Sequence, residues 1–338
     1  MNRRERYLRQ EAFKPIGPKG QEKLRNARVA VVGCGALGSG VVANLGRAGV
    51  GYIRIVDRDA LDITNLQRQN LFTEADCEER LPKAVAAAKR LREINSEVET
   101  EPHVAHVQPD NVLDMVADVD IVVDGTDNVE TRYLLNDACV KAGLPWIYGG
   151  AVGSQGLAMT VLPGRSACLR CVFEEAPPPG LLPTCHTIGV LNTITAAIGS
   201  IQATEAIKLL VGYSEGDIGL VQIDIWRGSF RTTPVARREE CPACVLHRFD
   251  FLRAGQASST AIVGRNAIQF VPSPPMSIDL TELAARLSRS GEARYNGFLV
   301  VANRESVVMT IFPDGRVLVE GTTDEPFARE LIRKYVGT

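Results

Sequence analysis

Four cysteines of this 338-residue chain form two closely spaced pairs. Cys168 and Cys171 flank a Leu-Arg dipeptide, and Cys241 and Cys244 flank a Pro-Ala dipeptide. Two such pairs supply four thiolates for a tetrahedral zinc ion with no open position, so the spacing predicts a structural site. The alternative is four unrelated reduced thiols.

A glycine-rich segment could bind a phosphate. Gly33, Gly35 and Gly38 follow an apolar run and open a helical stretch. Glycine lets a backbone approach a phosphate, and a helix N-terminus favours negative charge. Asp57 ends the next apolar run, where an acid can bind ribose hydroxyls. Taken alone, this pattern is that of an NAD enzyme, and a tight turn without a ligand is the alternative.

A cationic pair follows the second of these runs. Asn65 and Arg68 lie in the sequence NLQRQ, and Lys83 comes fifteen residues after Arg68. A dehydrogenase needs no such pair, whereas an enzyme that cleaves a triphosphate does, because arginine and lysine neutralise charge on the phosphates. The alternative is an ordinary solvated face.

The sequence DGTDN, residues 124–128, ends a further apolar run. Ligands of open α/β sheets lie at the carboxyl ends of the strands, so Asp127 is placed to hold Mg²⁺ between phosphate oxygens. Alternatively, Asp127 or Asn128 caps the following helix, and both roles can coexist.

The remaining cysteines have different surroundings. Cys139 is expected to pack in a helix, and Cys34 is a small residue of the glycine-rich segment. Cys185 lies beside His186 in a proline-rich stretch and could attack an acyl-adenylate, or it could be incidental.

These residues need a scaffold, and the chain alternates apolar strands with helical stretches, which predicts a parallel sheet wrapped by helices. Residues 174–189 contain three consecutive prolines and are predicted to be a long loop. The following stretch, 189–211, is apolar but contains Asn192, Gln202 and Glu205, which favours a buried helix over a membrane span. The expected strands are 28–33, 51–57 and 119–126, and the expected helices are 34–49, 81–95 and 127–141.

The pattern changes after Cys244. We predict three parts: an α/β domain over 1–250, a linker over 251–266 and a small α+β domain over 267–338. In the last part, Asp279 and Glu282 open a short helix, two β-rich runs (298–301 and 307–312) precede a turn and another strand, and a helix closes the chain near Tyr335.

Composition agrees with a cytoplasmic globular protein. The chain is 45% hydrophobic with a formal net charge of −2, which gives no reason to expect nucleic acid or an anionic membrane as a partner. Its N-terminus, MNRRERYLRQ, is charged and unlike a secretory signal.

Taken together, the motifs resemble those of the ThiF/MoeB family, the bacterial relatives of ubiquitin-activating enzymes, and are closest to its longer ThiF type. The resemblance runs from about residue 5 to residue 245. It rests on eight blocks in this order: RYLRQ, GCGALGS, DRDALDITNLQRQ, LPKA, DGTDNVETR, CLRC, TCHTIGVLNTITAAIGSIQATEAIK and CPAC.

The resemblance implies a homodimer with a Rossmann-like ATP-binding sheet. The implied reaction is adenylation of the C-terminal glycine of ThiS or MoaD, for thiamine thiazole or molybdopterin synthesis. A sulfur donor such as a cysteine desulfurase would then act on the product. The resemblance implies that Asp57 and Asp59 bind the nucleotide, that Asn65, Arg68 and Lys83 contact the phosphates, and that Asp127 is the catalytic acid linked to Mg²⁺. It implies that Arg9 of the partner subunit acts as an arginine finger and that Cys185 can join the carrier covalently. Zinc would be held by Cys168, Cys171, Cys241 and Cys244.

Two other functions are alternatives. An NAD-dependent oxidoreductase would account for Gly33 to Asp57 but not for NLQRQ, GTDN and the paired cysteines. A degenerate, non-enzymatic binding scaffold is disfavoured by the presence of Arg68, Lys83 and Asp127.

Overall fold

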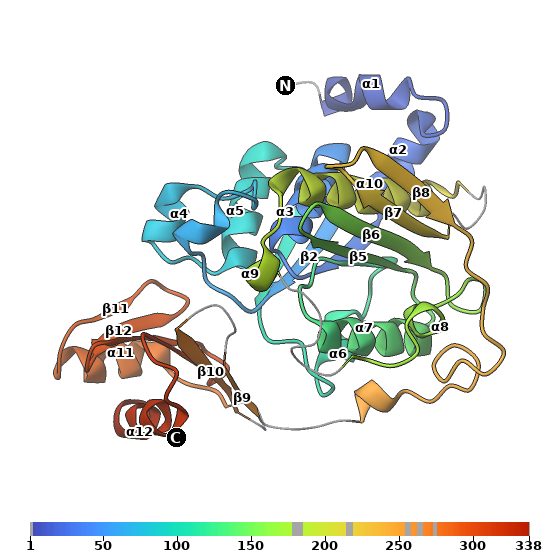
Figure 1. Ribbon diagram of the computed structural model, residues 1–338. Helices are drawn as coiled ribbons and strands as arrows, with labels where there is room; N and C mark the ends of the chain where they lie inside the picture. Colours follow the sequence, from blue (N-terminus) through green and yellow to red (C-terminus); the bar gives the residue numbers. More distant parts are fainter. Residues whose placement is uncertain are drawn as a thin grey trace. The chain divides into compact units, whose positions relative to one another are not determined.

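A computed structural model describes residues 3–177, 185–213, 219–253, 258–261, 266–272 and 276–337. The chain divides into two compact units. The first comprises residues 1–78 and 83–254, and the second comprises residues 79–82 and 255–338. Each unit has its own sheet (Figure 1).

The first unit is built on an eight-stranded sheet of order β3-β2-β1-β4-β5-β6-β7-β8, in which the first five strands are parallel. Chain order reverses between β1 and β4, and such a reversal is where ligands bind in open α/β sheets. The strands are β1 (Arg28–Val32), β2 (Tyr52–Asp57), β3 (Glu99–Val104), β4 (Ile121–Asp124), β5 (Trp146–Val152), β6 (Gln155–Val161), β7 (Leu220–Asp224) and β8 (Ser229–Thr233).

Helices cover both faces of this sheet (Figure 1). Strands β1, β2 and β4 are almost entirely buried, as expected for parallel strands covered on both sides. One group comprises α3 (Ala36–Ala48), α5 (Lys83–Ile94) and α10 (Asn192–Val211), and the other comprises α6 (Val112–Met115), α7 (Val129–Ala142) and α8 (Leu169–Val172). The remaining helices of this unit are η1 (Arg3–Tyr7), α1 (Leu8–Glu11), α2 (Gly17–Asn26), η2 (Ile63–Asn65), α4 (Glu74–Glu78), α9 (Cys185–Ile188) and η3 (Asp250–Leu252).

Helix α10 is long and apolar enough to cross a membrane, yet half of its most apolar window is buried inside the protein. It packs against α3, β5 and β6. Gln202, at the centre of the helix, is fully buried and its amide donates to the carbonyl oxygens of Asp124 at 2.6 Å and Ile147 at 3.2 Å. A side chain that bonds the ends of two sheet strands makes α10 a core helix, as the sequence predicted.

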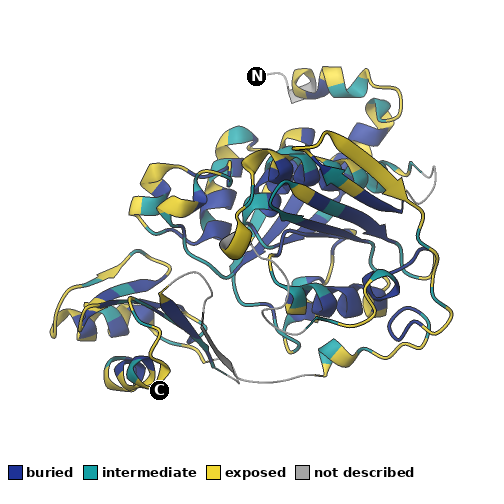
Figure 2. Ribbon diagram, viewed as in Figure 1, coloured by how far each residue is buried: buried dark blue, intermediate teal, exposed yellow. Residues whose placement is uncertain are grey.

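The second unit pairs a six-stranded sheet of order β11-β12-β13-β14-β10-β9 with α11 (Leu280–Ser288) and α12 (Glu325–Tyr335). Apolar side chains of these helices and of the four inner strands form one core, coloured as buried in Figure 2. Asp279 and Asp324 cap the two helices. The strands are β9 (Ser258–Ala261), β10 (Ala267–Val271), β11 (Ala293–Tyr295), β12 (Val300–Arg304), β13 (Val307–Ile311) and β14 (Val317–Glu320).

The predicted fold class is confirmed, and the structure adds local detail in two places. The short strand β9 lies within the predicted linker 251–266, where it pairs with β10, and the 3-10 helix η3 overlaps the start of that linker, where Phe251 packs on Tyr133 of α7. In the predicted long loop, α9 forms one helical turn after the last proline, because the proline restriction on the backbone ends there. Residues 178–184 of that loop lie outside the described residues.

Candidate active site and metal centre

The glycine-rich segment turns from β1 into α3 without a side-chain cap. Gly35 is the N-cap residue and makes no side-chain cap hydrogen bond. A Cβ on Gly33 or Gly38 would strike backbone atoms, whereas a Cβ on Gly35 would meet only Gln69, at 3.8 Å. The outer glycines are therefore needed for packing. Gly35 leaves open the approach to the uncapped amides, which suit a phosphate.

Asp57 connects this turn to the next strand. Its carboxylate accepts hydrogen bonds from the backbone amides of Cys34 at 2.6 Å and Asp59 at 2.8 Å. Asp57 is 8% exposed, and burial raises its pKa. Both sequence-predicted acids thus lie beside the glycine turn. Burial also raises the pKa of Cys34, which fits its predicted role as a small residue rather than a nucleophile.

Lys83 lies at the start of α5, and its ammonium nitrogen is 2.8 Å from Oδ2 of Asp59. Burial alone would lower the pKa of Lys83, but the carboxylates of Asp59 and Asp57, with a contribution from Asp127, raise it to about 12. The lysine is therefore cationic at neutral pH. It lies within electrostatic reach of three acids that the sequence assigned to one site.

The NLQRQ segment lies beside this cluster. Asn65 is buried, and its side-chain oxygen accepts the amide of Asp62 at 3.1 Å to complete the cap of η2. Arg68 is partly exposed and donates to the carbonyl oxygen of Thr64 at 2.9 Å. Gln69 is 3% exposed, and its side-chain oxygen has no hydrogen-bond partner in the described structure. Asn65 thus shapes the segment, and Arg68 remains accessible.

Asp127 is exposed in the turn between β4 and α7. Asn128, not Asp127, caps α7, because its side-chain oxygen accepts the amide of Thr131 at 2.8 Å. Capping therefore does not account for Asp127.

The sequence reasoning missed the residues that hold this turn. Arg132 donates to the carbonyl oxygen of Thr126 at 2.7 Å, and its Nε lies 3.8 Å from Oδ2 of the fully buried Asp124. Burial raises the pKa of Asp124 to about 6, although Arg132 and the hydrogen bonds from Thr126 act in the opposite direction. The arginine of the DGTDNVETR block was the available signal, since it lies on the first turns of the helix that follows Asp127.

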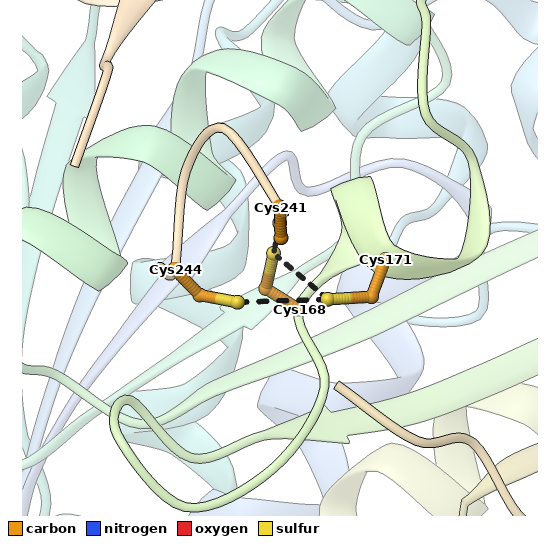
Figure 3. Close-up of side chains that lie close together, drawn as sticks. All are labelled: Cys168, Cys171, Cys241 and Cys244. Atoms are coloured by element: carbon orange, nitrogen blue, oxygen red, sulfur yellow. Dashed lines mark hydrogen bonds between the residues drawn. The ribbon is translucent and has the colours of Figure 1, made fainter. Parts of the chain in front are cut away.

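The four paired cysteines meet in one place, and Figure 3 shows their sulfur atoms converging. All four sulfur atoms lie within 4.8 Å of one another, with separations of 3.5 Å for Cys168–Cys241, 3.5 Å for Cys171–Cys244 and 4.0 Å for Cys168–Cys171. Tetrahedral zinc with Zn–S bonds of about 2.3 Å requires sulfur separations of roughly 3.8 Å. The donor set and its spacing therefore fit Zn²⁺.

The surroundings of this cluster tie it to α7. Arg170, inside the first cysteine pair, lies 3.2 Å from Asp250 and 3.9 Å from the buried Asp137 of α7. Asp137 also accepts the amide of Phe251 at 3.1 Å. The segment after the last cysteine is thereby fixed to the helix that Asn128 caps.

The N-terminal arm exposes Arg9. Tyr7 is buried and accepts a hydrogen bond from Asn95 at 2.8 Å, and Gln10 donates to the carbonyl oxygen of Ala48 at 2.8 Å. Arg9 and Leu8, between these anchors, are exposed. The backbone of Cys185 lies in α9, and its side chain is outside what the structure describes.

Comparisons with known proteins agree on one family. Residues 7–243 match the model of the ThiF family. The chain is 40% identical over 336 residues to the sulfur carrier protein ThiS adenylyltransferase of Bacillus subtilis, covering 98% of this chain and 99% of that protein. It is 42% identical over 241 residues to the SAMP-activating enzyme E1 of Haloferax volcanii, covering 71% and 88%.

Solved structures with this fold include MccB. The complex of this microcin C7 biosynthetic enzyme with N-formylated MccA is 26% identical, with a TM-score of 0.62 over 72% of this chain and 76% of that one. Escherichia coli MccB with ATP is 24% identical, with a TM-score of 0.59 over 67% and 69%, and this likeness concerns the fold alone.

Proposed function

This chain belongs to the ThiF family, and from that premise we propose that it adenylates the C-terminal carboxylate of a ThiS-type sulfur-carrier protein with ATP. The B. subtilis relative, similar over nearly the whole chain, favours a ThiS-type over a MoaD-type carrier. The observation that carries the proposal is the grouping of Lys83, Asp57, Asp59 and Asp127 beside the uncapped start of α3.

In the proposed reaction, an oxygen of the carrier's terminal carboxylate attacks the α-phosphorus of ATP. One P–O bond forms, the bond to the bridging oxygen breaks, and pyrophosphate leaves with its electron pair. The nucleophile is already an anion at neutral pH and needs no general base. Asp57 would bind the ribose, the amides after Gly35 would bind phosphate, and Lys83 and Arg68 would stabilise the departing pyrophosphate.

The site offers a carboxylate for magnesium. Asp127 is exposed at the carboxyl edge of the sheet and is not engaged in capping. Carboxylates that bind Mg²⁺ usually share it with substrate phosphates, which fits Asp127. Bound there, the metal would neutralise charge on the phosphate oxygens. Zinc on Cys168, Cys171, Cys241 and Cys244 would be structural, because all four positions are thiolates.

We propose that the active form of the enzyme is a homodimer. The arm residues Leu8 and Phe13 are 54% and 60% exposed, although both are large and apolar. Arg9 lies between the anchored Tyr7 and Gln10 and is exposed. An exposed arginine on an arm with exposed apolar side chains is suited to reach the phosphates of a partner subunit.

A protein substrate needs a binding surface on the enzyme. All five residues of β8 are exposed, and this strand ends the first sheet. Trp226 lies between β7 and β8 and is 79% exposed, and Phe230 lies in β8 and is 66% exposed. An edge strand with exposed aromatic side chains suits the binding of the carrier.

Cys185 would act after adenylation, either by capturing the carrier covalently or in sulfur transfer from a donor such as a cysteine desulfurase. The protein would act in the cytoplasm.

ATP–pyrophosphate exchange tests the proposal. Exchange should appear only with a carrier that has its terminal glycine, and more strongly with a ThiS-type than with a MoaD-type carrier. Cys185→Ala should retain exchange, because attack on the α-phosphorus needs no thiol. Tight binding of NAD without carrier-dependent exchange would instead establish the oxidoreductase alternative.

A further inference from the structure

Gln69 ends the NLQRQ segment, and the reaction proposed above does not use it. Its side chain is only 3% exposed, yet its side-chain oxygen has no hydrogen-bond partner among the described residues. Burying an amide oxygen without a donor destabilises a folded protein, and native proteins contain few such groups. The unpaired oxygen of Gln69 therefore needs a physical explanation.

The backbone around Gln69 is fixed. The carbonyl oxygen of Asn65 accepts the backbone amides of Arg68 at 3.1 Å and Gln69 at 3.0 Å, and the side chain of Asn65 completes the cap of η2. Leu71 and Phe72, which follow, are buried. The fold thus sets the place from which the side chain of Gln69 extends.

The side chain of Gln69 borders the glycine turn. Its amide nitrogen lies 3.8 Å from the position that a Cβ of Gly35 would occupy. Gly35 is the N-cap residue of α3 and makes no side-chain cap hydrogen bond. A buried side-chain amide therefore lies next to the uncapped helix start that suits a phosphate.

A space-filling role does not account for this arrangement. Asn136 of α7 shows how a buried amide is paired within this protein: its oxygen accepts the backbone amide of Leu169 at 2.9 Å, and its nitrogen donates to Oδ1 of Asp137 at 3.3 Å. The oxygen of Gln69 lacks such a donor. An unpaired acceptor beside an uncapped helix start indicates that its partner arrives with a ligand.

We propose that Gln69 is a further nucleotide-contacting residue, whose amide nitrogen donates to a phosphate oxygen of MgATP and whose side-chain oxygen accepts a hydrogen bond from bound MgATP. Phosphate oxygens accept hydrogen bonds, whereas the water molecules that Mg²⁺ usually keeps donate them. A glutamine amide provides both a donor and an acceptor. The inference rests on the proposed function, in which ATP binds at the glycine turn.

Gln69→Met in the full-length protein tests this, because methionine has a similar length and shape but no amide. KM for MgATP in carrier-dependent exchange should rise about tenfold, and Kd for MgATP measured by calorimetry without the carrier should rise equally. KM for the carrier should stay unchanged. Without nucleotide, the midpoint of urea denaturation should equal or exceed that of wild type, because an unpaired buried oxygen is removed.

Gln69→Glu tests the role of the amide nitrogen. The variant keeps an acceptor but replaces the donor with a second oxygen, and its negative charge repels the phosphates. It should therefore raise Kd for MgATP further than Gln69→Met does. A Kd equal to or below that of Gln69→Met would overturn the assigned donor.

The matched control is Asn136→Leu, since both polar atoms of this buried amide are paired. It should lower the denaturation midpoint and leave KM for MgATP unchanged. The inference is overturned if Gln69→Met binds MgATP as wild type does, or if it loses stability without nucleotide as Asn136→Leu does. Wild-type protein that binds MgATP in a Gln69-dependent manner but shows no carrier-dependent exchange would refute the proposed function alone.

Discussion

Lys83 and Asp59 are joined twice, once between side chains at 2.8 Å and once from the lysine amide to the aspartate carbonyl oxygen at 2.9 Å. The two residues are 24 positions apart, one after β2 and the other at the start of α5. This double link holds a charged lysine beside the glycine turn. Pre-orientation of this kind lowers the cost of assembling charge around a transition state.

Asp127→Asn should lower carrier-dependent pyrophosphate exchange by about a hundredfold or more, because the amide cannot hold the metal that neutralises the phosphates. The fold should survive, since Asn128 caps α7. Asn128→Ser is the matched control: serine also caps helices, so exchange should stay within about threefold of wild type. Near-normal exchange in Asp127→Asn would reject the catalytic assignment.

Protein purified without added metal should contain one zinc per chain, measured by elemental analysis. Cys241→Ser should lose most of the zinc and unfold at a lower temperature, because metal binding contributes directly to folding free energy. Cys77→Ser, at a partly exposed cysteine outside the cluster, should change neither property. A metal-free wild-type protein with normal stability would contradict the zinc site.

The buried carboxylate of Asp124 predicts a pH-dependent stability. Its pKa is about 6 in the folded protein against an ordinary value of 3.8, so the folded state binds the proton more tightly. Its contribution to stability is fully present below about pH 4 and is lost as pH rises through 6. Relative to Asp124→Asn, the wild-type free energy of unfolding should therefore fall by up to about 3 kcal/mol between pH 4 and 7. If the difference in free energy of unfolding between the two proteins is the same at every pH, the pKa of Asp124 is not raised by folding.

Subunit mixing tests Arg9. Arg9→Ala and Asp127→Asn homodimers should each be nearly inactive. If Arg9 acts across the dimer, each mixed dimer has one site that lacks both groups and one intact site, so about half of the wild-type activity per heterodimer should return. If it acts within its own subunit, mixing restores nothing. Mass spectrometry of the mixture confirms that subunits exchanged.

The sequence predicted that the candidate residues come together at one edge of the sheet, but it did not predict the contacts among them. Periodic apolar runs located β1, β2 and β4, and parallel strands bring their carboxyl ends to one edge, which is why Asp57 and Asp127 could be placed together. The two cysteine pairs could also be predicted from the sequence, because the spacing of zinc ligands is a local pattern.

Other features depended on tertiary structure. Lys83 pairs with Asp59 only because separate elements meet in the folded chain. The same is true of Arg132, which donates to the carbonyl oxygen of Thr126 in the turn that contains Asp127.

The most direct test of the central claim is transfer of label from ATP to the purified carrier. With ATP labelled at the α-phosphorus, the account predicts one adenylyl group on each carrier, one pyrophosphate released for each group transferred, and no transfer to a carrier that lacks its terminal glycine. Lys83→Ala should abolish the transfer. Label reaching the carrier from the γ-phosphorus instead, or inorganic phosphate as the released product, would contradict adenylation.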